Sequence, residues 1–291
     1  MIFKGLGVAV ITPFTPSLEV DYDAFKRIII NLIDQGVDYL VLMGTTAESP
    51  TLSSLEKRKI IDTAIEINKD RLPLVVGIGG NNTMQLVKEI SAFDFTSLHG
   101  ILSVSPYYNK PSQEGIYQHY KILSESTDMP IILYNVPGRT GSNLLAETTL
   151  RLAHDFKNIA AIKEASGDLP QIMQIIQSKP EDFLVISGDD LLTLPQMALG
   201  MDGVISVIGN AMPAEFADML KLALTDPLKA SSIHYKLLKF IHLIFAEGNP
   251  AGIKALLNHM KLCEPHVRPP LVQASQSLVD RIKDELLNFN S

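Results

Sequence analysis

A lysine at the end of an apolar run is the residue of this sequence with the clearest chemical potential. Lys163 follows the apolar stretch 159–162 in the segment IAAIKEASG. Lysine is almost never fully buried without a partner, because a buried ammonium loses its hydration. Two explanations are open: an ion pair with the neighbouring Glu164, or an amine with chemistry to do. The ion pair is the weaker explanation, since adjacent strand residues point to opposite faces.

A desolvated lysine favours the neutral amine, which is a nucleophile toward carbonyl groups. The product is an imine, and a protonated imine is an electron sink. Such chemistry needs an acid/base group and a holder for an anionic substrate. In the segment YNVPGRT, Tyr134 is placed to act as an acid/base phenol, and Arg139 could bind a carboxylate through its planar fork. The alternative for Arg139 is a surface loop cation.

Hydroxyl groups follow two other apolar runs. Thr45 and Thr46 lie in GTTAES, where they could hold a carboxylate or close the strand by a side-chain turn, and the residues favour neither. Tyr107 and Tyr108 lie in SPYYNKPSQEG, a proline-flanked loop in which packing is the default role of an aromatic ring.

Two further segments end at the same predicted rim. They contain Gly188, in SGDD, and Ile205, in GVISV. The pair Asp189 and Asp190 could suggest a metal, but a helix N-cap is the better interpretation, because no further carboxylates converge on it in sequence. We therefore predict no metal site.

Eight short runs rich in Val, Ile and Leu recur along the chain. Near-continuous apolar content is typical of parallel strands buried on both faces. Segments with helical periodicity separate them, for example 23–36, where Gly36 is the expected stop, and 54–70. The predicted strands are 7–12, 38–44, 73–79, 100–106, 130–136, 159–165, 183–189 and 203–209.

This alternation predicts an α/β fold, a (β/α)8 TIM barrel over residues 1–225. A doubly wound open sheet is the alternative, but it would leave edge strands and would usually carry a glycine-rich dinucleotide fingerprint, which is incomplete here. Residues 226–291 predict three helices, a C-terminal helical extension. In such barrels the active site lies at the carboxyl ends of the strands, where the residues named above are found.

The composition of the chain argues against several classes of function. The chain of 291 residues has a net charge of −7 and no basic block, which argues against binding to nucleic acid or an anionic membrane surface. Its apolar runs are too short to span a bilayer, and its first residues do not resemble a signal peptide. Cys263 is the single cysteine, so an intrachain disulfide is excluded. We expect a cytoplasmic protein.

Six motifs, in order, resemble the dihydrodipicolinate synthase / N-acetylneuraminate lyase family of class I aldolase-like enzymes. They are GVAVITPF, GTTAES, SPYYNKPSQEGIYQHY, YNVPGRT, IKEASG and SGDD, and the resemblance extends along essentially the whole chain. The arginine of YNVPGRT indicates the branch that uses aspartate semialdehyde, because the neuraminate lyase branch typically lacks it.

The resemblance implies a lyase of lysine and diaminopimelate biosynthesis that needs no metal or organic cofactor. Lys163 would form a Schiff base with pyruvate. Tyr134, Thr46 and Tyr108 would relay protons, with Tyr108 reaching in from a neighbouring subunit. The implied assembly is a homotetramer, a dimer of dimers.

The resemblance also implies how the two substrates, pyruvate and L-aspartate 4-semialdehyde, are held. Thr45 and Thr46 would bind the pyruvate carboxylate, and Arg139 the carboxylate of the semialdehyde. Gly188 and Ile205 would contact the site through backbone carbonyls.

Many members of the family are inhibited by L-lysine, and here the chain departs from the sensitive pattern. Ser54 and Lys57 replace histidines, and Gln85 replaces a glutamate, whereas Ser49, Asn81 and Tyr107 are retained. Loss of a carboxylate and gain of a cation disfavour an ammonium ligand. We therefore expect weak or absent inhibition by lysine at this remnant of an allosteric site.

Two alternative functions stay open. Another pyruvate aldolase of the superfamily, acting on a keto-deoxy sugar acid, would keep Lys163, Tyr134 and the threonines but should not need Arg139. A non-catalytic relative could use the barrel to bind an anionic metabolite, although the intact set of reactive groups makes this the weaker alternative.

Overall fold

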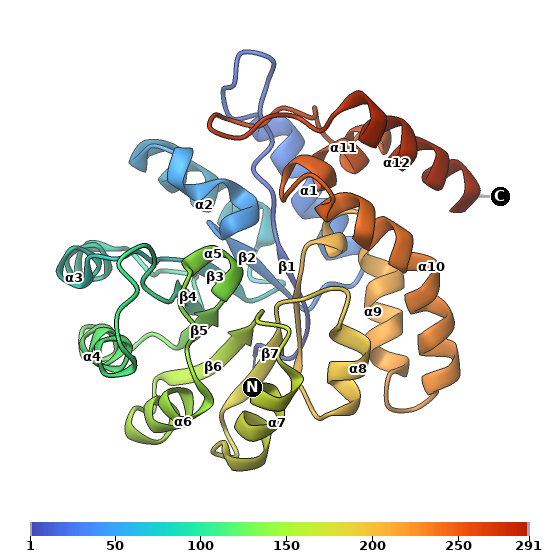
Figure 1. The fold of residues 1–291 in the computed structure, drawn as a ribbon. Coiled ribbons are helices and arrows are strands. Elements are labelled where there is room, and N and C mark those ends of the chain that lie inside the picture. The colour runs from blue at the N-terminus through green and yellow to red at the C-terminus, as the bar shows by residue number, and fades with distance from the viewer. Residues whose placement is uncertain (1, 290–291) are drawn as a thin grey trace. The chain divides into compact units, whose positions relative to one another are not determined.

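Eight parallel strands follow one another in chain order around a closed barrel in the computed structural model, which describes residues 2–289 (Figure 1). The predicted TIM barrel is confirmed. The strands are β1 (Gly5–Ala9), β2 (Tyr39–Leu42), β3 (Leu74–Gly77), β4 (Gly100–Val104), β5 (Ile131–Asn135), β6 (Ile159–Glu164), β7 (Leu184–Ser187) and β8 (Gly203–Ser206).

The strands are short and apolar, and nearly all of their residues are buried. Every residue of β2, β5, β7 and β8 is buried. Burial on both faces is what parallel strands require, because helices cover one face and the barrel interior fills the other. This explains why the apolar runs show no alternation in sequence.

Helices separate the strands, and several of them begin at polar caps. Asp21, Asn82, Ser112 and Asp168 each accept a backbone N–H of the first turn, and Ser53 forms a reciprocal capping box with Glu56. The helices are α1 (Tyr22–Asp34), α2 (Ser54–Asn68), α3 (Thr83–Ala92), α4 (Gln113–Ser124), α5 (Pro137–Thr140), α6 (Ala146–Asp155), α7 (Leu169–Ser178), α8 (Thr193–Ala198) and α9 (Pro213–Leu222). The expected stop at Gly36 is confirmed, since this glycine has a φ of 82° just after α1.

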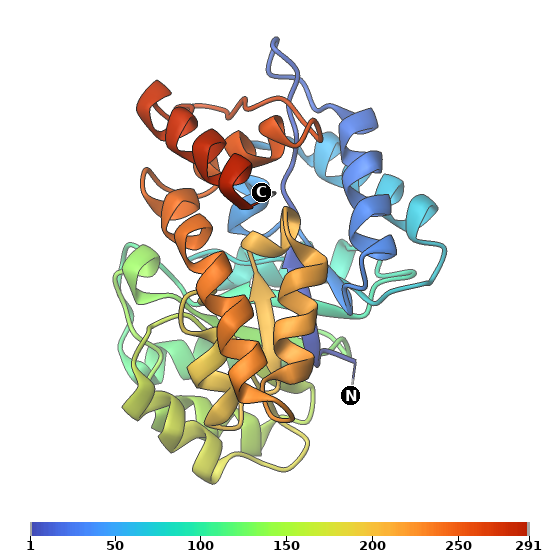
Figure 2. The same cartoon turned by 90° about the vertical axis from the view of Figure 1, so that its right-hand side faces the viewer.

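The predicted C-terminal extension of three helices is also confirmed. It consists of α10 (Pro227–Phe245), α11 (Ala251–His259) and α12 (Gln276–Phe289). Helix α10 runs alongside α9, as both views show, and it also packs against α11 and α12 (Figures 1 and 2).

The chain folds into two compact units. The first consists of the residues up to Lys4 and of Pro73–Ile205, and it contains most of β3–β8 with their helices. The second consists of Gly5–Leu72 and the chain from Ser206 onward, and it contains β1, β2 and the C-terminal helices. A functional boundary at residue 225, between barrel and extension, stays a prediction.

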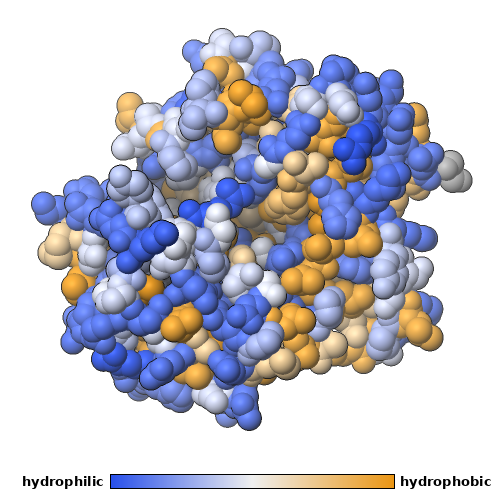
Figure 3. Space-filling view, viewed as in Figure 1, coloured by the Kyte–Doolittle hydropathy of each residue, from blue (hydrophilic) through white to orange (hydrophobic). Residues whose placement is uncertain are grey.

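The surface mixes polar and apolar side chains. Hydrophilic and hydrophobic residues are interspersed on the face in Figure 3. The most exposed large hydrophobic residues include Leu55, Tyr108 and Leu228. Within residues 2–289, none of the helices combines the length and the hydropathy of a membrane span.

The second unit contains a buried ion pair that the sequence did not reveal. Lys254 of α11 is 0% exposed, and its Nζ lies 2.6 Å from Oε1 of the buried Glu48. The ammonium also donates to the carbonyl of His266 at 2.8 Å and lies 4.2 Å from the ring centroid of Phe14. Burial lowers the pKa of Lys254, and the charge of Glu48 opposes this effect. Removal of either partner would leave the other charge buried and unpaired.

We expect Lys254→Met to lower the free energy of unfolding by roughly 3–5 kcal/mol, the cost of breaking a buried ion pair on one side. Equilibrium denaturation measures this. The matched control is Arg58→Met, which breaks the exposed Arg58–Asp62 pair and should cost less than about 1 kcal/mol. Equal losses in the two variants would contradict the importance of the buried pair.

Candidate active site

The structure brings Lys163 and Tyr134 together on neighbouring strands of the first unit. The two residues are paired in register between β5 and β6, and both side chains are buried, each 6% exposed. The Lys163 Nζ lies 4.4 Å from the centroid of the Tyr134 ring. The amine therefore lies over an aromatic ring, at a distance that allows a cation–π contact.

The next residues along the same two strands, Asn135 and Glu164, point to the opposite face. Asn135 Nδ2 donates to Glu164 Oε2 at 3.0 Å, Gln171 Nε2 donates to the same oxygen at 3.0 Å, and the Ser166 amide donates to Oε1 at 2.7 Å. Glu164 is thus buried among neutral donors of the helix side rather than paired with Lys163. The ion-pair explanation for Lys163 is wrong, because the alternation of strand side chains separates the two groups.

Gly188, just after β7, lies against the stem of the Lys163 side chain. A Cβ atom at this glycine would lie 3.0 Å from Lys163 Cε and 2.7 Å from the Cβ of Ala165. The absence of a side chain here therefore leaves the space that Lys163 occupies. The sequence indicated Gly188 only as a backbone contact, and this steric reason appears only in the structure. Ile205 lies in β8 and is 1% exposed.

Two other predicted residues of this unit lie on exposed segments. Arg139 occupies the short helix α5 and is exposed. Tyr108 is 85% exposed and has a φ of 73°, a left-handed conformation that is strained for a bulky side chain. Its backbone N–H donates to the carbonyl of Thr140 at 3.4 Å, next to Arg139 in sequence. This hydrogen bond ties the loop of Tyr108 to the turn of Arg139.

The threonine pair lies in the second unit, in a single 3-10 turn (Thr45–Ala47) directly after β2. Thr46 is 2% exposed, and its Oγ1 accepts a hydrogen bond from Nδ2 of Asn249 at 2.9 Å. Thr45 is half-buried. Asn249 was not among the predicted site residues, because its place before a proline indicated only the start of a helix.

The residues of the predicted allosteric remnant divide between the two units. In the first, Asn81 Nδ2 donates to the carbonyl of Tyr107 at 3.2 Å, and the exposed Gln85 donates to Glu89 at 3.3 Å. The other three lie at or near the start of α2 in the second unit: Ser49, Ser54 and Lys57.

Asp189, one member of the acidic pair after β7, has a structural use. Asp189 Oδ1 accepts the backbone N–H groups of Leu191 and Leu192, although the N-cap of α8 itself is Leu192 and makes no side-chain cap. Asp189 therefore binds backbone N–H groups at and just before the start of α8, and it is not the N-cap residue that was predicted. Within residues 2–289 we find no group of three or more His, Cys, Asp or Glu residues that could hold a metal ion.

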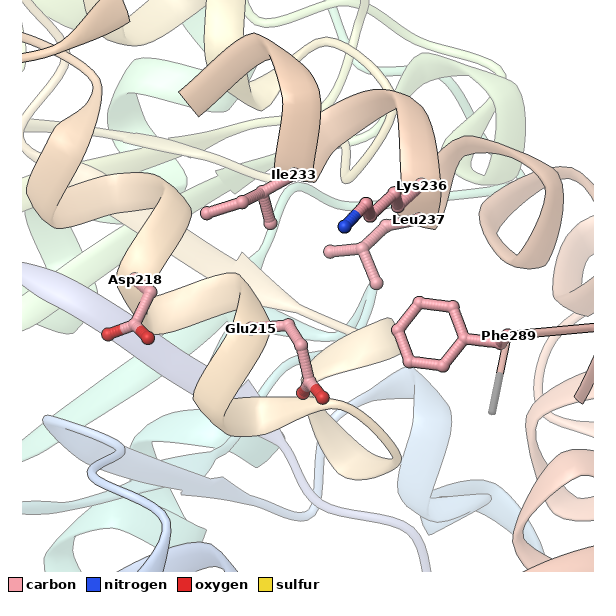
Figure 4. A pocket seen from close by; sticks show the side chains of 6 residues that line it. All are labelled: Glu215, Asp218, Ile233, Lys236, Leu237 and Phe289. Atoms are coloured by element: carbon pink, nitrogen blue, oxygen red, sulfur yellow. The ribbon is translucent and has the colours of Figure 1, made fainter. Parts of the chain in front are cut away.

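A surface pocket lies outside this set of residues. It is formed by α9, α10 and the end of α12 (Figure 4), and none of the predicted site residues lines it. Its lining residues are Glu215, Asp218, Ile233, Lys236, Leu237 and Phe289.

Comparisons with known proteins agree with the motifs. A 4-hydroxy-tetrahydrodipicolinate synthase of Flavobacterium psychrophilum is 55% identical over 281 residues, 96% of each chain. The crystal structure of a dihydrodipicolinate synthase from Thermotoga maritima superposes with a TM-score of 0.96 at 39% identity, covering 100% of this chain and 99% of that one. The chloride-inhibited enzyme of the same name from Acinetobacter baumannii, solved with pyruvate, has a TM-score of 0.95 at 35% identity, with coverage of 100% and 99%.

A family model spans almost the whole sequence. The model of the dihydrodipicolinate synthetase family matches residues 2–288. The chain belongs to this family.

Proposed function

We propose that this protein is a lyase that condenses pyruvate with L-aspartate 4-semialdehyde, the reaction of 4-hydroxy-tetrahydrodipicolinate synthases (EC 4.3.3.7), on the route to diaminopimelate and lysine. The observation that carries the proposal is the buried Lys163 amine beside the Tyr134 ring, in a chain about half identical to enzymes of that name. The cytoplasm stays the predicted location.

The first step is imine formation. The Lys163 amine attacks the C2 carbonyl of pyruvate, the relay groups supply one proton, the carbonyl oxygen leaves as water, and a protonated imine remains. A cation over the face of an aromatic ring is stabilised by the ring quadrupole. The Tyr134 ring centroid lies 4.4 Å from the Lys163 Nζ, so the ring can stabilise the positive charge of the imine nitrogen. The tyrosine phenol and the Thr46 hydroxyl carry protons to and from the intermediates.

The second step is carbon–carbon bond formation. Loss of a proton from the methyl carbon converts the imine to an enamine, because the cationic nitrogen accepts the electron pair. The enamine carbon attacks the aldehyde carbon of the semialdehyde, and the resulting alkoxide takes up a proton. The amino group of the new chain then attacks the imine carbon and displaces Lys163, which closes the ring and frees the enzyme.

Binding groups follow from the chemistry of the two substrates. Thr45 and Thr46 hold the pyruvate carboxylate through hydrogen bonds, and Arg139 binds the semialdehyde carboxylate through its planar fork. Backbone groups of Gly188 and Ile205 complete the site.

Tyr108 extends the relay across a subunit interface. Its exposed phenol, on a strained loop tied to the Arg139 turn, is free to serve a second subunit. The proposed assembly is a dimer of such pairs, a homotetramer.

A coupled assay with both substrates tests the function. We expect condensation that depends on pyruvate and on the semialdehyde. Retro-aldol cleavage of a keto-deoxy sugar acid, without condensation, would instead identify another pyruvate aldolase. No turnover of either kind would point to a metabolite-binding protein.

We expect Gly188→Ala to lower kcat about 10- to 100-fold, because the new methyl group displaces the Lys163 side chain by a fraction of an ångström. Steady-state kinetics on the folded variant measure this. Gly80→Ala is the matched control, since its Cβ would meet only ordinary contacts with Leu86. Unchanged kcat in Gly188→Ala would contradict the close packing of this glycine on Lys163.

We expect the enzyme to keep most of its initial rate in millimolar L-lysine, because Gln85 and Lys57 offer no added negative charge to an ammonium. The triple variant Ser54→His, Lys57→His, Gln85→Glu should become more sensitive. Strong inhibition of the unmodified enzyme by submillimolar lysine would show that the remnant still binds lysine.

A further inference from the structure

The hydroxyl of Thr46 is held by a residue far away in sequence. Asn249, 203 positions later, donates from Nδ2 to Thr46 Oγ1 at 2.9 Å, and both side chains are buried. A threonine oxygen that accepts this bond must direct its own hydrogen elsewhere. The amide therefore holds the Thr46 oxygen in position and excludes one direction for its hydrogen.

The end of the threonine turn is anchored to the same C-terminal segment. Glu48 follows the turn with a φ of 54°, and its carboxylate accepts from Lys254 Nζ at 2.6 Å and from the Arg268 backbone N–H at 2.8 Å. Both cations lie on the Phe14 ring, with Lys254 at 4.2 Å and Arg268 at 4.5 Å from its centroid. The side chain of Glu48 is 1% exposed.

The two sets of contacts act on one short stretch of backbone. Asn249 holds the Thr46 hydroxyl in the middle of the turn. Lys254 holds the carboxylate of Glu48, the residue that follows the turn. The hydrogen-bond donors all come from α11 and the segments on either side of it, 249–268. A turn fixed at both points has little freedom to reorient Thr46, and proton transfer depends steeply on such orientation.

We infer that Asn249 is a positioning residue for catalysis, which orients the Thr46 hydroxyl from the C-terminal extension. The inference rests on the proposed function, in which Thr46 relays protons. The extension is then part of the reaction's machinery, because the Asn249 amide holds the Thr46 oxygen in place while its O–H donor stays available for proton transfer.

Kinetics of Asn249→Ala test this inference. We expect kcat for the condensation to fall about tenfold or more, a part of the roughly 10²–10⁴-fold that a positioned acid/base group contributes. The matched control is Asn258→Ala, which removes a side-chain amide bond of the same segment, to the Cys263 carbonyl at 3.0 Å. The kcat of Asn258→Ala should stay within about twofold of that of the unmodified enzyme, a change too small for the loss of an acid/base role.

A double variant separates positioning from a general structural effect. In a Thr46→Val background, assayed at high enzyme concentration to record the residual rate, Asn249→Ala should have almost no further effect on kcat, since the hydroxyl it orients is gone. Thermal unfolding midpoints of Asn249→Ala and Asn258→Ala should agree.

Two results would overturn the inference while the proposed function stands. One is an equal change of kcat in Asn249→Ala and Asn258→Ala. The other is the same loss from Asn249→Ala with and without Thr46. An unmodified enzyme that does not condense the two substrates would overturn the proposed function, and the inference with it.

Discussion

The register between β5 and β6 is the constraint on which the rest of the site depends. It pairs Tyr134 with Lys163 and, one residue later, Asn135 with Glu164. Because strand side chains alternate, the first pair faces one side of the barrel wall and the second faces the other. A shift of β6 by one residue would place Glu164 opposite Tyr134 and would turn Lys163 to the other face of the barrel wall. The hydrogen bonds of Glu164 with Asn135 and Gln171 fix this register from the helix side.

Two buried lysines show how surroundings decide what an amine does. Lys254 has a carboxylate at 2.6 Å and a backbone carbonyl at 2.8 Å, so its charge is satisfied and its role is structural. Lys163 has an aromatic ring beside it and a glycine against its stem. Space and an uncommitted amine are what a nucleophile needs, whereas a lysine held by an ion pair has little reason to react.

Much of the architecture could be predicted because it depends on residue patterns that are local in the sequence. Buried parallel strands need continuous apolar runs, and each of the eight runs became a strand. Gly36 ended its helix because a left-handed residue favours glycine. Lys163 could be found because a lysine ends an apolar run, whereas Tyr134 and the threonine turn were indicated by their place at the predicted rim and by the family motifs. Their catalytic roles stay predictions.

The residues that sequence reasoning missed act across long separations. Asn249 meets Thr46 over 203 positions, and Lys254 meets Glu48 over 206. Neither pairing leaves a local signal, since a lysine on a helix and an asparagine before a proline look ordinary. Gly188 was recognised at its strand end, but its contact with the Lys163 stem depends on the packing of two strands.

Borohydride trapping shows directly whether the Lys163 amine forms an imine with pyruvate. The protein is incubated with pyruvate, reduced with borohydride, digested and mapped by mass spectrometry. The account predicts a single reduced pyruvate adduct on the peptide that contains Lys163, and none in Lys163→Ala. An adduct at another lysine, or no covalent adduct in an enzyme that still condenses its substrates, would contradict it.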